Sequence, residues 1–132
     1  MIFKKEELLI IIDFGSQFTQ LIARRLRELK VYCEIHPYSS ISKHFLTEID
    51  AKGFILSGSP ASTLDKNIPK VPLSLYNLGV PILGICYGQQ LMMTQLGGCI
   101  ESNFKTAEFG KAYIRKVGDD ISLFDGWFIK DE

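Results

Sequence analysis

The chain has 132 residues, 46% of them apolar, and its 15 basic and 15 acidic residues leave no net charge. This length suits one domain with one packed core. A basic excess is missing, so we expect no nucleic acid and no membrane surface as partner. The longest apolar run covers five residues, at 8–12, against the roughly 20 that a membrane-spanning helix needs.

The number and spacing of the cysteines indicate whether the protein forms disulfides or binds zinc, and in which cellular compartment it resides. The three cysteines, at positions 33, 86 and 99, show no CxxC spacing. We therefore expect neither a disulfide framework nor a zinc site, and no other cofactor. The N-terminal residues also lack the order of a secretion signal. A reducing cytoplasm is the expected location.

The first hundred residues alternate between strand-like and helix-like segments. Apolar or alternating runs predict strands at 8–12, 31–36, 53–56 and 80–85. Between and after them, helical spacing predicts helices within 18–29, near 42–48, at 72–78 and at 89–96. This alternation predicts an α/β fold: a flavodoxin-like parallel sheet with helices on both faces. The apolar residues of the first and last helices are expected in the core: Phe18, Leu21, Ile22, Leu26, Leu29, Leu91, Met92, Met93 and Leu96.

After Gly98 the pattern changes. Residues 99–101 and 111–117 predict two further strands, the second strongly alternating. Residues 118–120 predict a turn, and 121–124 predict one helical turn.

The motif Gly84-Ile85-Cys86-Tyr87-Gly88 lies between a predicted strand and a predicted helix. A nucleophile with glycines two residues before and after it is typical of a nucleophile elbow, a sharp turn that raises the side chain above the strand tips. The helix start beyond it favours a thiolate. The alternative is that Cys86 is a small buried hydrophobic residue, as unpaired cysteines commonly are.

A second turn, Ser57-Gly58-Ser59-Pro60, follows the third predicted strand. It is either an ordinary turn or a cradle of main-chain N–H groups for an oxyanion. In the second case the amide of Tyr87 supplies one donor and the Gly58–Ser59 turn the other. Turns after parallel strands meet at one sheet edge, which favours this interpretation.

Other polar residues near these turns are assigned as follows. Asp13 or Ser16 is predicted to cap the first helix, with a second role at the pocket floor. Gln90 is predicted to point at a bound substrate amide. A cysteine hydrolase needs a histidine base, often oriented by an acid. His36 lies near a strand end without an acid at useful spacing, so a surface or capping role is favoured. Nothing in the sequence supports His44 as the base.

Several segments together resemble a known family. IIDFGSQFTQLIARR at 11–25 and VYCE at 31–34 resemble the start of the class I glutamine amidotransferase domain of the GMP synthases. GFILSGSPAS at 53–62 resembles its oxyanion strand, and GICYGQQ at 84–90 with QLGG at 95–98 its nucleophile segment. EFG at 108–110 resembles a later signature, so the likeness runs from about residue 9 to residue 117.

The resemblance implies a reaction and partners. Cys86 would attack the side-chain amide of glutamine, giving a glutamyl thioester and ammonia, and water would then release glutamate. The ammonia would pass to an ATP-pyrophosphatase synthetase domain or subunit, which aminates XMP to GMP. The implied site is Cys86 as nucleophile, with Gly58, Ser59, Tyr87 and Gln90 at the oxyanion and substrate, and Gly84 and Gly88 shaping the elbow.

The sequence also departs from the family pattern. The family's base and orienting acid form a His-x-Glu motif, which this sequence lacks, and there is no synthetase domain. Ser59 replaces a second glycine, so a turn needing positive φ would be strained. Ala107 occupies a position at which the family generally has arginine. We therefore expect residues 1–132 to be a partial, C-terminally truncated amidotransferase domain, either a piece of a larger protein or a decayed, free-standing relic, with negligible glutaminase activity alone.

Three other interpretations stay open. The chain is a non-catalytic module that binds glutamine or a synthetase, or it is a redox-active or glyoxalase-like cysteine protein of the same superfamily. The third is an unstable fold, because loss of closing strands would bare a sheet edge.

Overall fold

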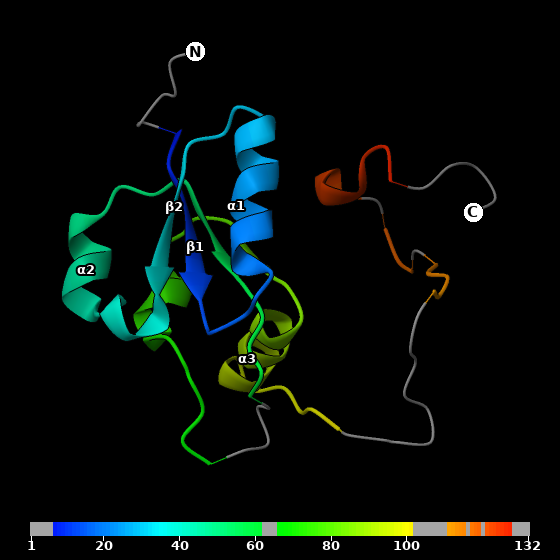
Figure 1. The fold of residues 1–132 in the computed structure, drawn as a ribbon. Coiled ribbons are helices and arrows are strands. Elements are labelled where there is room, and N and C mark those ends of the chain that lie inside the picture. The colour runs from blue at the N-terminus through cyan, green and yellow to red at the C-terminus, as the bar shows by residue number, and fades with distance from the viewer. Residues whose placement is uncertain (1–6, 62–65, 102–110, 116, 120, 128–132) are drawn as a thin grey trace. The chain divides into compact units, whose positions relative to one another are not determined.

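The computed structural model describes residues 7–61, 66–101, 111–115, 117–119 and 121–127. The chain divides into two compact units, Met1–Ile100 and Glu101–Glu132. The strands and α-helices of the described residues all lie in the first unit (Figure 1). No helix within the described ranges is long and apolar enough to cross a membrane.

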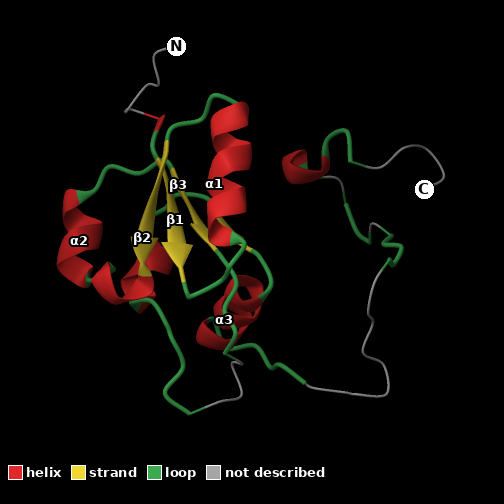
Figure 2. Ribbon diagram, in the orientation of Figure 1, coloured by secondary structure: helices red, strands yellow, loops and turns green. Residues whose placement is uncertain are grey.

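A parallel four-stranded sheet forms the centre of the first unit (Figure 2). Its strands are β1 (Leu9–Asp13), β2 (Cys33–Pro37), β3 (Gly53–Leu56) and β4 (Ile82–Gly84). They are paired in the order β2-β1-β3-β4, which is the order of the first four strands of a flavodoxin-like sheet. The predicted α/β fold is confirmed, although β4 is shorter than the predicted strand at 80–85.

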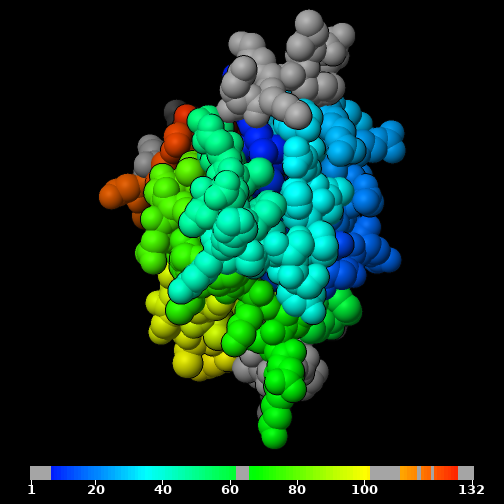
Figure 3. All heavy atoms as spheres, turned by 90° about the vertical axis from the view of Figure 1, so that its left-hand side faces the viewer, coloured from blue at the N-terminus to red at the C-terminus, as the bar shows by residue number. Residues whose placement is uncertain are grey.

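Helices cover both faces of this sheet, as predicted. Helix α1 (Thr19–Glu28) packs on one face, where Ile11, Cys33 and Ile55 meet Ala23. The other face carries α2 (Lys43–Glu48), a 3₁₀-helix at Leu73–Asn77 and α3 (Tyr87–Gln95). The buried residues that meet there include Ile10, Ile12, Leu46, Leu56, Leu75 and Leu91. Figure 3 shows the side of the molecule on which α2 adjoins the edge strand β2.

Side-chain hydrogen bonds fasten the segment before β4 to α3. The Tyr76 hydroxyl donates to Gln95 Oε1 at 2.7 Å, and Gln95 Nε2 donates to the Val71 carbonyl at 2.8 Å. Burial raises the pKa of Tyr76 to about 12. The helix that begins beside Cys86 is therefore held at its far end as well.

The core prediction for α1 and α3 was wrong at several positions. Phe18 is 58% exposed and Leu21 is 44% exposed, and the two line a cavity described below. Leu29, Met93 and Leu96 are also exposed. Phe18, Leu29 and Leu96 lie just outside the two helices, where the contact with the sheet stops.

Neither predicted strand after Gly98 forms in the described residues 99–101, 111–115 and 117. Alternation places side chains on two faces, but a strand also needs a neighbour that pairs with its N–H and C=O groups. Tyr113, Ile114 and Val117 are exposed instead. The helical turn predicted at 121–124 is confirmed as a 3₁₀-helix, Ser122–Phe124. Ala107 and the signature at 108–110 lie outside the described residues.

Candidate active site

Cys86 occupies a strained bend between β4 and α3. It has φ of 54° and ψ of −116° and is the N-cap residue of α3. Positive φ brings the Cβ of an L-residue close to its own backbone, at a cost of roughly 1–2 kcal/mol. The cysteine is free and exposed. The bend thus presents the thiol outward rather than into the core.

The two glycines beside Cys86 are needed for steric reasons. A Cβ added to Gly84 would lie 2.7 Å from both Cα and N of Gln89, and one added to Gly88 would lie 2.1 Å from the Leu56 carbonyl oxygen. These neighbours are main-chain atoms, which cannot turn aside as a flexible side chain could. The close approach of α3 to β3 and β4 therefore depends on both glycines.

A cavity of about 540 Å³ lies beside Cys86, a volume within the range of small-molecule sites. It brings the cysteine together with the predicted oxyanion turn. A Cβ added to Gly58 would lie 3.9 Å from the Cβ of Cys86. The residues that line it are Gly15, Ser16, Gln17, Phe18, Leu21, Ile22, Gly58, Ser59, Pro60, Ile85 and Cys86.

Two other predicted site residues do not line this cavity. The Tyr87 side chain is buried against Phe14, with ring centroids 5.4 Å apart, and its hydroxyl donates to the Pro69 carbonyl. Only the main chain of Tyr87 adjoins Cys86. Gln90 is exposed one turn into α3, and its N–H donates to the Cys86 carbonyl at 3.2 Å.

The strain expected at Ser59 is not found. Among the described residues other than glycine, only Lys30, Asn67 and Cys86 have positive φ. Ser59 therefore avoids the left-handed region in which its Cβ would clash. Its Oγ accepts a hydrogen bond from the Ala61 N–H at 3.0 Å, which closes a small turn.

The polar residues before α1 act differently from the predicted caps. Ser16 Oγ accepts from the Phe18 N–H at 3.0 Å, and Asp13 Oδ1 accepts from the Gly15 N–H at 2.9 Å. Both bonds lie in the turn that precedes the helix. The N-cap residue is Phe18, which makes no side-chain cap bond, so the predicted capping role was wrong.

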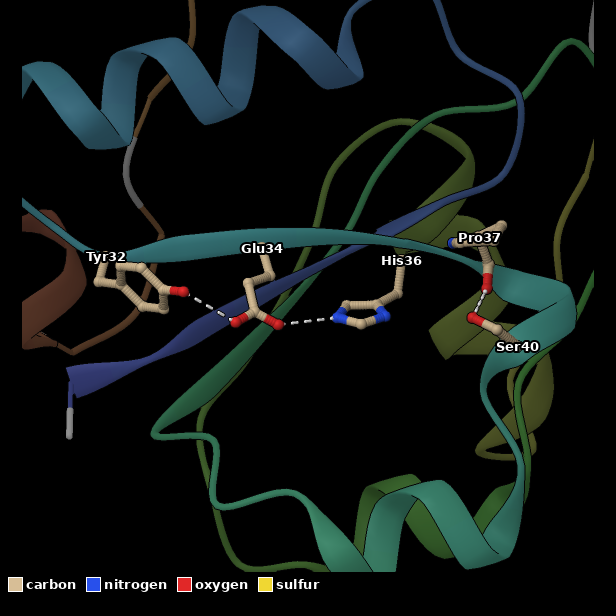
Figure 4. A network of polar contacts seen from close by, with 5 residues as sticks. All are labelled: Tyr32, Glu34, His36, Pro37 and Ser40. Carbon is tan, nitrogen blue, oxygen red and sulfur yellow. Dashed lines mark hydrogen bonds and ion pairs between the residues drawn. The ribbon is translucent and has the colours of Figure 1, made fainter. Parts of the chain in front are cut away.

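His36 has an acid partner that the sequence reasoning missed. His36 Nε2 lies 3.1 Å from Glu34 Oε1, and the Tyr32 hydroxyl donates to Glu34 Oε2 at 3.0 Å (Figure 4). The hydrogen bond to Glu34 raises the pKa of Tyr32. The signal was available, because residues two apart on a strand share a face.

His36 is nevertheless far from Cys86. Across the sheet, His36 is paired with Ile12, Ile12 with Leu56, and Leu56 with Gly84. Three strand spacings of about 4.8 Å place the backbones of His36 and Gly84 roughly 14 Å apart. That exceeds hydrogen-bond reach several times over. Of the described residues, those lining the Cys86 cavity include no histidine and no acid, and no group of three or more His, Cys, Asp or Glu could hold a metal ion.

The fold and the site together define an α/β protein with an exposed cysteine at a strained strand-to-helix bend, beside a glycine-containing turn. The sequence profile of "Glutamine amidotransferase class-I" matches residues 10–125. The chain belongs to the class-I glutamine amidotransferase family.

The chain is similar to several proteins that are named GMP synthase. GMP synthase [glutamine-hydrolyzing] of Dinoroseobacter shibae is 59% identical over 121 residues, which are 92% of this chain and 23% of that protein. The protein of the same name from Brucella melitensis is 52% identical over 92% of this chain and 24% of its own length. The chain thus spans about a quarter of these relatives. A crystal structure from Thermoplasma acidophilum, described as one of a GMP synthase subunit, is 31% identical with a TM-score of 0.53, and the match covers 69% of this chain and 45% of that one.

Proposed function

We propose that Cys86 is the nucleophile of a glutamine-hydrolysing half-reaction. The observation that carries this proposal is the positive φ of 54° at an exposed cysteine, on a bend that opens into a cavity shared with Gly58 and Ser59. A strained backbone at a non-glycine residue persists only where the surrounding structure enforces it, and such residues cluster at functional sites.

In the proposed reaction the Cys86 sulfur attacks the side-chain carbonyl carbon of glutamine. The carbonyl oxygen becomes an oxyanion, which accepts hydrogen bonds from main-chain N–H groups of Tyr87 and of the Gly58–Ser59 turn. Collapse of this intermediate expels ammonia and leaves a glutamyl thioester, which water hydrolyses to glutamate and the free thiol. Loss of a single oxyanion donor typically lowers kcat by about 10²–10³-fold.

General acid–base help is the part that the described cavity does not supply. The thiol must lose a proton and the leaving nitrogen must gain one. A positioned acid or base that catalyses these proton transfers typically raises the rate by roughly 10²–10⁴-fold. The sequence has no His-x-Glu segment, and His36 belongs to the opposite sheet edge. We propose that the isolated chain does not turn over glutamine steadily.

We further propose that the ammonia serves a synthetase partner that aminates XMP to GMP. The name and identity of the relatives support this assignment. None of the described residues that line the cavity carries a charged side chain, so charged groups beyond them are expected to bind the charged end of glutamine. A reducing compartment such as the cytoplasm would keep the thiol unoxidised.

The test uses an electrophilic glutamine analogue, in which –CH₂Cl replaces the side-chain –NH₂. The thiol displaces chloride at this carbon, forming one C–S bond and releasing HCl, so the adduct is read by mass spectrometry. We expect the L-chloroketone to alkylate Cys86 much faster than its D-enantiomer, and free L-glutamine to slow the reaction. No ammonia should accumulate when L-glutamine is added alone.

The other two cysteines are internal controls. Cys33 is buried, and burial raises the pKa of its thiol, so it should react only after unfolding. Cys99 is exposed and should react without preference between enantiomers. Equal rates for both enantiomers at Cys86 would contradict the proposed function. Protection of Cys86 by glutamine without enantiomer-selective alkylation would favour a binding module instead.

A further inference from the structure

A buried polar network lies directly behind the cavity. It joins Asp13 at the end of β1, Thr19 at the start of α1 and Ser57 just after β3. We infer that Thr19 and Ser57 are positioning residues, which fix the Gly58–Ser59 turn relative to Cys86. This inference rests on the proposed function, and its experiment separates the two.

Ser57 is attached to β1 through both its main chain and its side chain. Its N–H donates to the Ile12 carbonyl at 3.2 Å, and its Oγ donates to the same oxygen at 2.9 Å. The residue is completely buried. Since Ser57 immediately precedes Gly58, its position decides where the oxyanion turn begins.

Thr19 connects Ser57 to the opposite wall of the cavity. Its Oγ1 donates to Asp13 Oδ1 at 3.0 Å, and the residue is 2% exposed. Thr19 Oγ1 also lies 3.0 Å from Ser57 Oγ and accepts there, because its own proton goes to Asp13; the single Ser57 hydroxyl proton is shared between Thr19 Oγ1 and the Ile12 carbonyl. Asp13 Oδ1 also accepts from the Gly15 N–H. Two hydroxyl groups and one carboxylate thus tie the 13–19 segment to Ser57, which lies 38 positions beyond Thr19.

The two cavity walls held by this network lie close together. A Cβ added to Gly58 would lie 3.3 Å from Ser16 Oγ, and one added to Gly15 would lie 3.5 Å from Pro60 Cδ. The turn therefore has little free space on the Ser16 side. A displacement of the 13–19 segment would therefore change the space that is available to the Gly58–Ser59 turn.

Buried hydroxyl groups at this place need an explanation, because an unpaired buried hydroxyl costs about 1–3 kcal/mol. Apolar residues would pack between β1, β3 and α1 without that risk. Hydrogen bonds, however, fix direction and distance, whereas apolar contacts tolerate sliding. Oxyanion donors act only when aimed at the developing charge, and functional groups must be held within about 0.5 Å. The network meets this requirement for the Gly58–Ser59 turn.

The experiment compares two alkylation rates at Cys86 in Thr19→Val, Thr19→Ser and Ser57→Ala. The L-chloroketone presents a carbonyl oxygen to the turn and depends on its placement. Iodoacetamide, used at low concentration, reports thiol exposure and ionisation. Thr19→Val keeps the shape of the side chain. We expect it to lower the ratio of the chloroketone rate to the iodoacetamide rate about tenfold, which is less than the roughly 10²-fold loss of rate that a misplacement of about 1 Å can cause.

Ser57→Ala is expected to lower the ratio in the same direction, and Thr19→Ser should restore it because the hydroxyl returns. Ser42→Ala is the matched control. It removes one serine hydroxyl that accepts the Phe45 N–H at 3.0 Å and caps α2, at a stability cost of about 1 kcal/mol. It should leave the ratio unchanged.

An unchanged ratio in folded Thr19→Val and Ser57→Ala, with the wild type still enantiomer-selective, would overturn the inference alone. A parallel fall of both rates would also overturn it, since the network would then be structural only. Loss of enantiomer selectivity in the wild type would instead defeat the proposed function. If Thr19→Val does not fold, Ser57→Ala decides, because it retains the main-chain bond to Ile12.

Discussion

The carboxyl ends of β4 and β2 lie at opposite edges of one sheet and are built in different ways. After β4 the chain turns through the strained Cys86 and leaves its thiol exposed beside a cavity. Near the end of β2, His36 is held within the fold, with its ring against Phe45 at 5.0 Å and its Nε2 against Glu34. The end of β4 leaves the Cys86 thiol exposed, whereas the end of β2 holds the His36 ring in contacts with Phe45 and Glu34.

This difference explains why the histidine nearest to a strand end is not the partner of the cysteine. A base must lie within hydrogen-bond reach of the proton that it takes. The Glu34–His36 pair has the chemical form of an oriented base, yet the register of the sheet separates it from the Cys86 bend by three strand spacings. In the proposed reaction the base has to come from residues other than His36.

The largest expected effect comes from destroying the bend after β4. Gly88→Ala would place a Cβ against the Leu56 carbonyl, and a main-chain neighbour can give way only by moving the strand. We expect a loss of about 3 kcal/mol or more in the free energy of unfolding, measured by urea denaturation.

Gly79→Ala is the matched control for that substitution. Gly79 has φ of +76° but no atom within 4 Å of its added Cβ. Only the conformational cost of roughly 1–2 kcal/mol applies there. Equal losses in the two variants would show that α3 does not depend on close approach to β3.

The second prediction separates stability from reactivity at the β2 end. His36→Ala removes the ring contact with Phe45 and should cost about 1 kcal/mol of unfolding free energy. The iodoacetamide rate of Cys86, followed from pH 6 to 9, should keep its shape and stay within about twofold of the wild type. His44→Ala, at an exposed position of α2, is the control for loss of a histidine. A displaced pH profile in His36→Ala alone would mean that the histidine acts on the thiol.

Local sequence rules were sufficient for the four strands of the sheet, the helix order and the bend. Gly84 and Gly88 mark the bend because the α3 approach leaves no room for a Cβ at either position. Ser42 marks the start of α2 because its side chain accepts the Phe45 N–H. For Gly84 and Ser42 the physical cause acts between residues that are close in sequence, whereas Gly88 is required by the carbonyl of Leu56, 32 positions away.

Features that depend on distant residues were missed. Thr19 and Ser57 meet across 38 positions, and no spacing pattern reveals that contact. The alternation at 111–117 was interpreted as a strand because a sequence shows side-chain pattern but not the pairing partner. The Glu34–His36 pair was missed for a different reason, since the two-residue period of a predicted strand already places both on one face.

The smallest expected effect tests the hydrogen bond between Tyr32 and Glu34 at β2. This bond raises the pKa of Tyr32 above the usual value of about 10, so the folded state holds the phenol proton more tightly than the unfolded state. Its stabilising contribution is complete below about pH 10 and is lost as the pH rises through the raised pKa. Glu34→Gln and Tyr32→Phe should each lose less stability than the wild type between pH 8 and 11, measured by urea midpoints. Parallel alkaline losses in all three proteins would show that solvent screens the hydrogen bond between Tyr32 and Glu34 completely.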